Sequence, residues 1–320
     1  MMIKKIGVLT SGGDAPGMNA AIRAVIRAGL EANLEMYVIY NGYKGIIDRT
    51  IEKVDRKFCA EIINRGGTKI GTARLPEFSQ DEVQNKAVEI LKEYGIDALV
   101  TIGGDGTYKG ALALSRKGIR CVALPGTIDN DVASSDYTIG FFTALQTIVD
   151  CIDKLRDTSS SHQRCSVVEV MGRYCGDLAV YASLASGADI VITRENPMAE
   201  EDLLEEIKNQ VNMGKHHIMV IITEHITDVS ALADKITKNC GIEAKSEVLG
   251  RIQRGGTPVA IDRTLATTMG VFAVDTLLQG DTGVCIGIID NKLTATPIEK
   301  ALKMENKSNK FLKHMLCRTR

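Results

Sequence analysis

The amino-acid sequence predicts an α/β protein built on mainly parallel β-sheet. Two observations carry this expectation: short apolar runs recur along the chain, and amphipathic segments with helical spacing lie between them. Uniformly apolar runs are typical of parallel strands buried on both faces, and alternating strands and helices favour right-handed crossovers. With 320 residues, the chain is long enough for two domains.

Each apolar run marks one expected strand. The clearest helix follows the first run, where apolar or small residues recur at the i, i+3, i+4, i+7 spacing of one helix face: Met18, Ala21, Ile22, Val25, Ile26, Gly29 and Leu30. The expected strands are Ile6–Thr10, Met36–Tyr40, Ala98–Ile102, Cys121–Leu124, Val167–Met171, Ile190–Thr193, Ile218–Thr223 and Val284–Ile289.

Composition excludes several classes of function. The chain carries 39 Lys and Arg against 40 Asp and Glu, so its net charge of −1 gives no global field to attract nucleic acid or an anionic membrane. Aromatic residues make up only 4% and Trp is absent, which argues against stacking platforms for single strands. We therefore expect neither a nucleic-acid nor a membrane partner.

Cysteine spacing and missing motifs exclude further classes of protein. The eight Cys form no C-x-x-C pair and no zinc-spaced cluster with His, which is typical of reduced thiols in a cytoplasmic protein. No run of about 18 apolar residues occurs. The sequence also has no P-loop, no G-x-G-x-x-G, no H-E-x-x-H and no G-x-S-x-G motif.

Paired glycines follow two of the expected strands. Gly12 and Gly13 follow the first strand, Gly103 and Gly104 follow the third, and each pair is followed by Asp. Such loops let a backbone approach a phosphate, and the next helix adds a partial positive charge. A purely geometric role as turn glycines is the alternative. A second repeated segment, Arg-Gly-Gly-Thr at 65–68 and again at 254–257, also suggests backbone N–H groups presented to an anion.

A third unusual loop, residues 124–131, places Asp129 and Asp131 two residues apart after the strand Cys121–Leu124. Phosphoryl transfer uses one carboxylate to hold Mg²⁺ on the phosphates and another to accept the proton of the attacking hydroxyl. Asp and Asn are also ordinary turn formers. Because the carboxyl ends of parallel strands share one edge, all three loops are expected to lie together at a ligand site.

Fixed cations are needed to offset phosphate charge. Candidates are Arg164, Arg173, Arg251 and Arg254, each of which taken alone has the alternative of an ordinary solvated surface residue. Arg23 and Arg27 lie one helical turn apart, so they are placed either to hold an anion together or to face water.

Five segments resemble the bacterial ATP-dependent phosphofructokinase family, and the resemblance extends over essentially the whole chain. The segments are residues 9–21, 102–107, 124–131, 157–164 and 170–177. The resemblance implies two Rossmann-like three-layer domains with the active site in the cleft between them. Residues 1–140 with 254–306 would form the nucleotide-binding domain, and 141–253 with 307–320 the sugar-phosphate-binding domain.

The same resemblance implies roles for individual residues in transfer from ATP to fructose 6-phosphate. Asp129 would be the base, with Thr127 beside it, and Asp105 would hold Mg²⁺. The family's ATP site maps onto Gly13, Arg74, Leu75, Gly104, Asp105, Gly106 and Thr107, with Gly13, Arg74 and Arg173 also in catalytic roles. Its sugar-phosphate site maps onto Thr127, Asp129, Arg164, Met171, Gly172, Arg173, Glu224, Lys245, Arg251 and Arg254.

Donor choice and two departures can be derived from this resemblance. Family members that use pyrophosphate typically carry Asp at the position of Gly106 and Lys at that of Gly126, so ATP is the expected donor. The family usually has His at position 251 and Arg at position 245, whereas this chain has Arg251 and Lys245. A Lys lacks the bidentate fork of Arg, so a weaker or shifted KM for the sugar phosphate is expected.

Assembly and regulation are further implications. In the family, the residue at position 164 reaches the site of a neighbouring subunit, which implies a homo-oligomer, usually a tetramer. ADP or phosphoenolpyruvate would be the effector, at a site that maps onto Arg23, Arg27, Arg56, Arg156, Asp189, Lys215 and His217. The alternatives are a related kinase with another sugar-phosphate acceptor or a pyrophosphate donor, and a regulatory subunit that binds nucleotide without catalysis.

Overall fold

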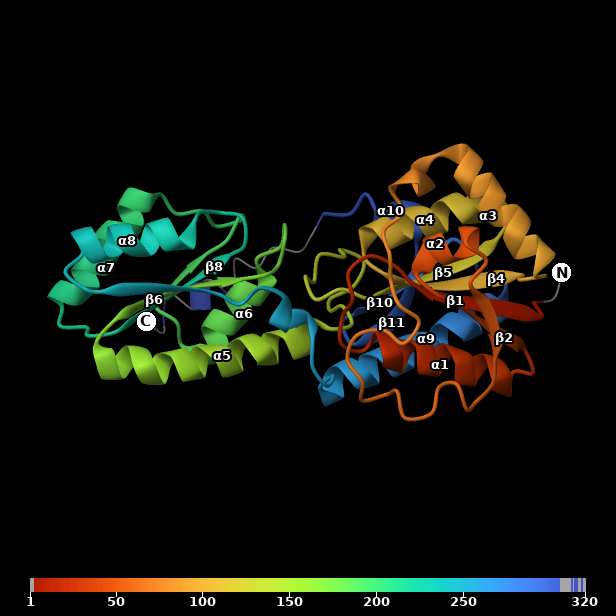
Figure 1. The fold of residues 1–320 in the computed structure, drawn as a ribbon, viewed down its shortest axis with the longest axis horizontal. Helices are drawn as coiled ribbons and strands as arrows, with labels where there is room; N and C mark the ends of the chain where they lie inside the picture. Colours follow the sequence, from red (N-terminus) through yellow and green to blue (C-terminus); the bar gives the residue numbers. More distant parts are fainter. Residues whose placement is uncertain (1–2, 306–311, 313, 316–317, 319–320) are drawn as a thin grey trace. The chain divides into compact units, whose positions relative to one another are not determined.

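The computed structural model describes residues 3–305 together with residues 312, 314, 315 and 318 (Figure 1). The chain forms two compact units. Unit 1 extends to Thr143 and resumes at Arg254, and unit 2 comprises Ala144–Gln253. Of the segment 307–320 that the sequence assigns to the second domain, the structure describes only the four residues named above, and Cys317 lies outside them.

Unit 1 contains a seven-stranded sheet in the order β11-β10-β5-β4-β1-β2-β3. Its five inner strands are parallel, whereas β3 and β11 pair antiparallel at the two edges. The strands are β1 (Lys5–Thr10), β2 (Glu35–Ile39), β3 (Ile51–Val54), β4 (Ala98–Gly103), β5 (Arg120–Pro125), β10 (Val284–Ile289) and β11 (Lys292–Pro297).

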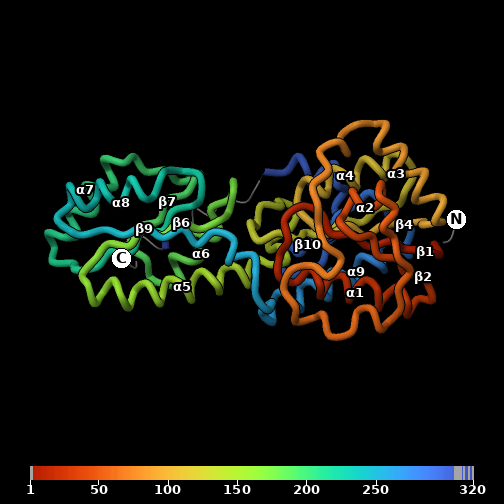
Figure 2. Tube along the Cα trace, viewed as in Figure 1, coloured from red at the N-terminus to blue at the C-terminus, as the bar shows by residue number. Residues whose placement is uncertain are grey.

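Helices cover both faces of this sheet. The helices α1 (Met18–Glu31) and α9 (Ala260–Gln279) lie side by side on one face (Figures 1 and 2). They approach closely because Gly270 has no side chain: a Cβ there would lie 2.7 Å from Ala24 Cβ. The opposite face is covered by α2 (Gly42–Ile47), α3 (Asp81–Glu93), α4 (Asp105–Arg116) and α10 (Ile298–Ala301), and a short 3₁₀ turn, η1, spans Pro76–Ser79.

Unit 2 contains a four-stranded parallel sheet in the order β7-β8-β6-β9. Two helices share an apolar core with one face, and two lie on the other (Figure 1). The strands are β6 (Cys165–Val170), β7 (Ile190–Ile192), β8 (Ile218–Thr223) and β9 (Ala244–Val248). The helices are α7 (Glu200–Asn212) and α8 (Val229–Asn239) on the first face, and α5 (Phe141–His162) and α6 (Asp177–Ser186) on the second. The first turn of α5, up to Thr143, belongs to unit 1, and so does Arg254, the last residue of the 3₁₀ turn η2 (Gly250–Arg254).

The predicted α/β class is confirmed, and each expected apolar run forms a strand. Three further strands, β3, β9 and β11, were not predicted; all three are edge strands with mostly exposed or half-buried side chains. Each of these three strands carries polar or charged residues on its exposed side, so it lacks the continuous apolar run that predicts the other strands. In the described part of the chain, no helix has the length and apolar character needed to cross a membrane.

Candidate functional site

The three loops singled out by the sequence lie together at one edge of the unit 1 sheet. They follow β1, β4 and β5, which are adjacent strands in the sheet. The Ser11 N–H donates to Ile102 O at 3.0 Å, and the Gly126 N–H donates to Gly103 O at 3.1 Å. From β1 the chain first adds β2 on one side, and it later adds β4 and β5 on the other side of β1. The loops after β1 and β4 therefore diverge at the point where the strand order changes direction, which is the usual ligand position in such sheets.

The first loop is exposed at Gly12 and Gly13. Gly12 has a φ of +88°, a left-handed conformation that favours glycine. A Cβ on Gly13 would lie 3.0 Å from an Arg254 guanidinium nitrogen. The structure therefore brings together Gly13, a predicted nucleotide residue, and Arg254, a predicted sugar-phosphate residue.

The second loop leads directly into α4. Asp105 and Gly106 are exposed in the first turn of this helix, while Thr107 is buried and its hydroxyl donates to Ser11 O at 3.0 Å. A Cβ on Gly103 would lie 2.2 Å from Thr107 Oγ1 and 2.3 Å from Ser11 O, so only glycine fits there. The helix N-terminus thus faces solvent at Asp105 and Gly106, an arrangement suited to an anion.

The third loop is closed by its own hydrogen bonds. The Thr138 hydroxyl donates to Thr127 O at 2.6 Å, and the Thr138 N–H donates to Asn130 Oδ1 at 3.0 Å. Asn130 has a φ of +53°, and the Asp129 N–H donates to Thr127 Oγ1 at 3.2 Å. Asp129 is 8% exposed, so the loop holds a carboxylate almost buried within unit 1.

The sequence pairs Asp131 with Asp129 as a candidate carboxylate, although the family resemblance gives Asp131 no role. It lines a small cavity of about 150 Å³ together with Asp105 and residues from the end of α10. The two-residue spacing from Asp129 is the signal that pointed to it. Within the described residues, no group of three or more His, Cys, Asp or Glu side chains forms a metal site. Mg²⁺ in kinases is held by one or two carboxylates plus substrate phosphates, which fits Asp105 and Asp131.

Residues 65–75 lie along the first loop. The Thr72 hydroxyl donates to Gly12 O at 2.8 Å, and Arg74, which is exposed, and Leu75 follow it before η1. The repeated Arg-Gly-Gly-Thr segments contact each other, because a Cβ on Gly66 would lie 2.3 Å from Gly256 O. The repeat thus brings the two glycine turns into close backbone contact. That these turns present N–H groups to an anion stays a prediction.

Unit 2 places Met171, Gly172 and Arg173 directly after β6 and Glu224 directly after β8. The Arg173 N–H donates to Glu224 Oε1 at 3.0 Å, and Arg173 has a φ of +55°. A Cβ on Gly172 would lie 2.4 Å from Cys175 O, so this turn requires glycine. Two of the predicted sugar-phosphate residues, Arg173 and Glu224, are therefore in direct contact.

Three further predicted cations lie elsewhere in unit 2. Arg164 Nε and Lys245 Nζ both contact Glu243, at 2.8 Å and 3.0 Å. Lys245 and then Arg164 lower the pKa of the Glu243 carboxyl. Arg251 is exposed within η2. The surface carboxylate thus joins two of the cations that sequence reasoning named separately.

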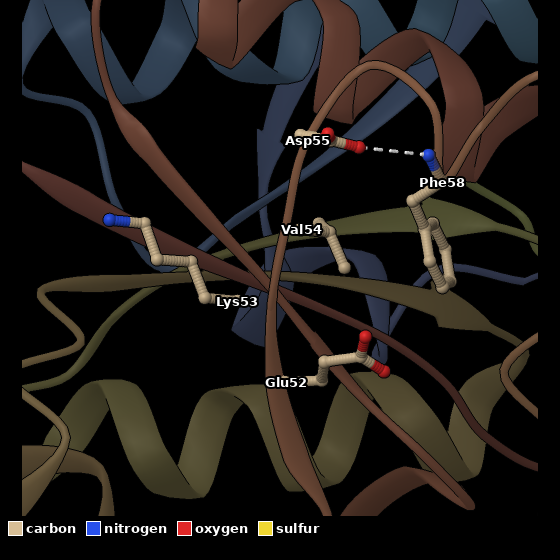
Figure 3. Close-up of a pocket in the computed structure, with 5 residues that line it drawn as sticks. All are labelled: Glu52, Lys53, Val54, Asp55 and Phe58. Carbon is tan, nitrogen blue, oxygen red and sulfur yellow. Dashed lines mark hydrogen bonds between the residues drawn. The ribbon is translucent and has the colours of Figure 1, made fainter.

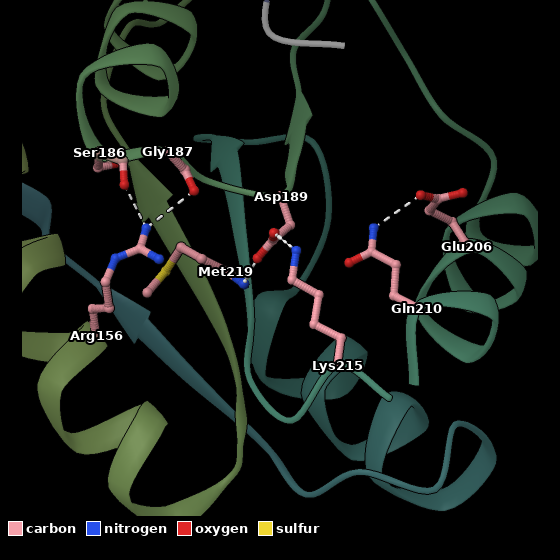
Figure 4. A network of polar contacts seen from close by, with 8 residues as sticks. All are labelled: Arg156, Ser186, Gly187, Asp189, Glu206, Gln210, Lys215 and Met219. Atoms are coloured by element: carbon pink, nitrogen blue, oxygen red, sulfur yellow. Dashed lines mark hydrogen bonds and ion pairs between the residues drawn. The ribbon is translucent and has the colours of Figure 1, made fainter. Parts of the chain in front are cut away.

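The predicted effector residues fall in both units. In unit 1, Arg23 and Arg27 lie on α1, and Arg56 follows β3 beside an open hollow of about 510 Å³ lined by Glu52, Lys53, Val54, Asp55 and Phe58 (Figure 3). In unit 2, Lys215 forms an ion pair with Asp189, and Arg156 donates to Ser186 O and Gly187 O (Figure 4). His217 is half-buried just before β8.

Comparison with known proteins assigns the family. The family model "Phosphofructokinase" matches residues 5–277. The ATP-dependent 6-phosphofructokinases of Edwardsiella ictaluri and Serratia proteamaculans are 57% and 56% identical over 302 residues, which is 94% of this chain and 94% of each relative. A structure of phosphofructokinase from Saccharomyces cerevisiae superposes with a TM-score of 0.86 at 35% identity, covering 99% of this chain, which spans 47% of the yeast chain. The chain belongs to the phosphofructokinase family.

Proposed function

We propose that the chain transfers the γ-phosphoryl group of ATP to the 1-hydroxyl of fructose 6-phosphate, giving fructose 1,6-bisphosphate and ADP. This is the reaction of ATP-dependent 6-phosphofructokinase, a glycolytic kinase and the activity named for the close bacterial relatives. The observation that supports it best is the meeting of three loops at one sheet edge. They place a nearly buried carboxylate, Asp129, beside the glycine-rich loops expected to bind phosphates.

The glycines of unit 1 support ATP as the donor. No atom lies within 4 Å of a Cβ built on Gly106, so the loop leaves open space there. A Cβ on Gly126 would lie 2.9 Å from Ile102 Cγ2, so a larger side chain at that position needs rearrangement. The acidic and basic side chains expected in pyrophosphate users are absent from both positions. We assign Gly13, Arg74, Leu75, Gly104 and Thr107 to the nucleotide site of unit 1.

The chemical step follows from the carboxylates. Asp129 takes the proton of the 1-hydroxyl as that oxygen attacks the γ-phosphorus, and the bond to the leaving ADP oxygen breaks. Asp105, with Asp131, would hold Mg²⁺, which when bound neutralises charge on the nucleotide phosphates. Arg74 and Arg173 stabilise charge on the transferring group, because fixed guanidinium groups need no reorganisation during the reaction.

The remaining assignments concern the sugar phosphate. Unit 2 supplies Met171, Gly172, Arg173, Glu224 and Arg251, while Arg254, Thr127 and Asp129 belong to unit 1. Arg164 and Lys245 serve the site of a neighbouring copy in a homotetramer. Their shared contact with Glu243 supports a joint role for this pair.

The proposal also includes an effector site and a cytoplasmic location. Bound ADP or phosphoenolpyruvate would be held by Arg23, Arg27, Arg56, Arg156, Asp189, Lys215 and His217, and the paired Asp189 and Lys215 support a polar site at that place in unit 2. We place the reaction in the cytoplasm, where reducing conditions keep thiols free. The structure gives no disulfide among the seven cysteines in the described part of the chain.

A coupled assay on the purified chain tests the function. It should turn over ATP with fructose 6-phosphate, and Asp129→Asn should lower kcat by about 10²–10⁴-fold, the usual contribution of a general base. Turnover of pyrophosphate but not ATP would overturn the donor assignment, and preference for another sugar phosphate would overturn the acceptor. A chain that binds nucleotide but has no activity would be a regulatory subunit.

A further inference from the structure

Helix α5 begins at a residue that cannot cap it. Gly140, just before the helix, has a φ of +109°, and a Cβ there would lie 2.7 Å from Ala15 Cβ. The position therefore requires glycine, which has no side-chain oxygen to accept the free N–H groups of the first turn. These donors are buried at Gly140 and Thr143 and need a partner from another part of the chain.

Asp262 of α9 supplies that partner. Its Oδ1 accepts the Gly140 N–H at 2.9 Å, and its Oδ2 accepts the Thr143 N–H at 2.7 Å and the Thr143 hydroxyl at 2.6 Å. The same hydroxyl oxygen accepts the Val259 N–H at 3.1 Å. The Asp262 side chain is fully buried; burial raises the pKa of its carboxyl, while the hydrogen bonds from Thr143, Gly140 and Phe142 act in the opposite direction.

This cap also closes the loop that carries Asp129. The Ile139 N–H, one residue before Gly140, donates to Pro125 O at 2.8 Å, which joins the end of the loop to its beginning. The Thr138 hydroxyl bonds to Thr127 O inside the loop. A shift of the first turn of α5 would therefore be passed to the backbone that holds Asp129, since close-packed interiors transmit small displacements.

We propose that Asp262 is a positioning residue for phosphoryl transfer: by capping α5 from another helix, it fixes the closed end of the loop that presents Asp129. This inference rests on the proposed role of Asp129 as the base. Thr143 is the second residue of this helix cap, because its hydroxyl donates to Asp262 and accepts the Val259 N–H.

Two substitutions test the helix cap, one with a large and one with a small change to its hydrogen bonds. Asp262→Asn keeps the shape but turns an NH₂ group toward an N–H or hydroxyl donor. Thr143→Val keeps the shape of Thr143 and removes only its hydroxyl, and Thr143→Ser restores the hydroxyl. Thr276→Val on α9, the helix that carries Asp262, is the matched control, because it also removes a buried hydroxyl, one that bonds to Phe272 O at 2.7 Å.

The measurements are kcat, the KM for each substrate, ADP affinity by calorimetry, and amide hydrogen exchange by mass spectrometry. A displacement of about 1 Å at a reacting group can cost about 10²-fold in rate. We expect kcat to fall about 10²-fold in Asp262→Asn and about 10-fold in Thr143→Val. ADP affinity should stay within about 2-fold, and exchange should rise in residues 138–143. Thr143→Ser should recover most of kcat, and Thr276→Val should leave kcat unchanged.

A Thr143→Val enzyme with faster exchange at residues 138–143 but wild-type kcat would overturn the proposal, because the cap would then be structural only. Equal losses in Thr143→Val and Thr276→Val would overturn it as well. These outcomes differ from failure of the proposed function, in which Asp129→Asn itself would retain wild-type kcat. Thr143→Val keeps the test decisive where Asp262→Asn fails to fold.

Discussion

The proposed nucleotide loops of unit 1 and the proposed sugar-phosphate residues of unit 2 are built in different ways. The loops of unit 1 are fixed by close packing: a Cβ on Gly103 or on Gly126 would lie within 3 Å of another atom, and the buried Thr107 hydroxyl joins the second loop to the first. In unit 2, Arg164, Lys245 and Glu243 are held by partly exposed ion pairs. Backbone packing tolerates almost no change, whereas exposed pairs contribute little energy and are easily replaced.

The two departures from the family pattern that the sequence resemblance implies agree with this contrast. Lys245 and Arg251 are both exposed side chains of unit 2, and neither is part of the glycine loops. A site held by exposed side chains can change its residues without disturbing the fold. We therefore expect substitutions in unit 1 to affect stability and rate, and substitutions in unit 2 to affect mainly the KM for the sugar phosphate.

The largest effect is expected for Gly103→Ala. The new Cβ would overlap Ser11 O and Thr107 Oγ1, so the loop must shift, at a cost of about 3 kcal/mol in the free energy of unfolding. Denaturant titration measures this loss. Gly106→Ala is the matched control in the same loop, because its Cβ meets no atom within 4 Å. It should be at least as stable as wild type, with a raised KM for ATP; equal destabilisation of both variants would contradict the contrast.

The next effect concerns Glu224. Glu224→Ala removes the acceptor of the Arg173 N–H and leaves the left-handed turn at Arg173 without that support. A lost bond to a charged group costs about 1.5–3 kcal/mol, which corresponds to about a 10- to 150-fold rise in the KM for fructose 6-phosphate. Steady-state kinetics with both substrates checks this. Glu224→Gln should recover part of the loss, and a parallel rise in the KM for ATP would argue against a role confined to the sugar phosphate.

A smaller effect is expected when the family residues are restored. Arg251→His and Lys245→Arg should each lower the KM for fructose 6-phosphate by about 2- to 5-fold, since each contact with an exposed charge is worth about 0.2–1 kcal/mol. Circular dichroism should show unchanged thermal stability for both. Two unaltered KM values would mean that these positions tolerate either residue.

The smallest effect is a pH dependence at Glu243. Because Lys245 and Arg164 lower its folded-state pKa, Glu243 stabilises the fold above its ordinary pKa of 4.5, and this contribution is lost as the pH falls through the lowered value. Glu243→Gln should therefore lower the melting temperature slightly at pH 7, and should leave it unchanged at a pH below the lowered pKa of Glu243. A larger decrease at acid pH than at pH 7 would contradict the assigned ion pairs.

Much of the fold could be predicted because it depends on local pattern. The central strands carry continuous apolar runs, and the spacing of Met18, Ile22 and Ile26 predicts α1. The edge strands β3, β9 and β11 could not be found this way, because their exposed faces carry polar side chains. Among site residues, Asp131 was visible as a spacing from Asp129, but the cavity that it lines with Asp105 is completed by residues at the end of α10, which is far away in sequence.

The amino-acid sequence by itself determined the class of fold, the glycine loops at strand ends and the resemblance to one kinase family, because these depend on residue type and short spacing. Only the tertiary structure decided which distant groups meet. Glu243 joins Arg164 to Lys245, and Asp262 caps a helix that begins about 120 residues earlier in the chain. Such contacts have no local signal, because they form only when the packed core brings separate segments together.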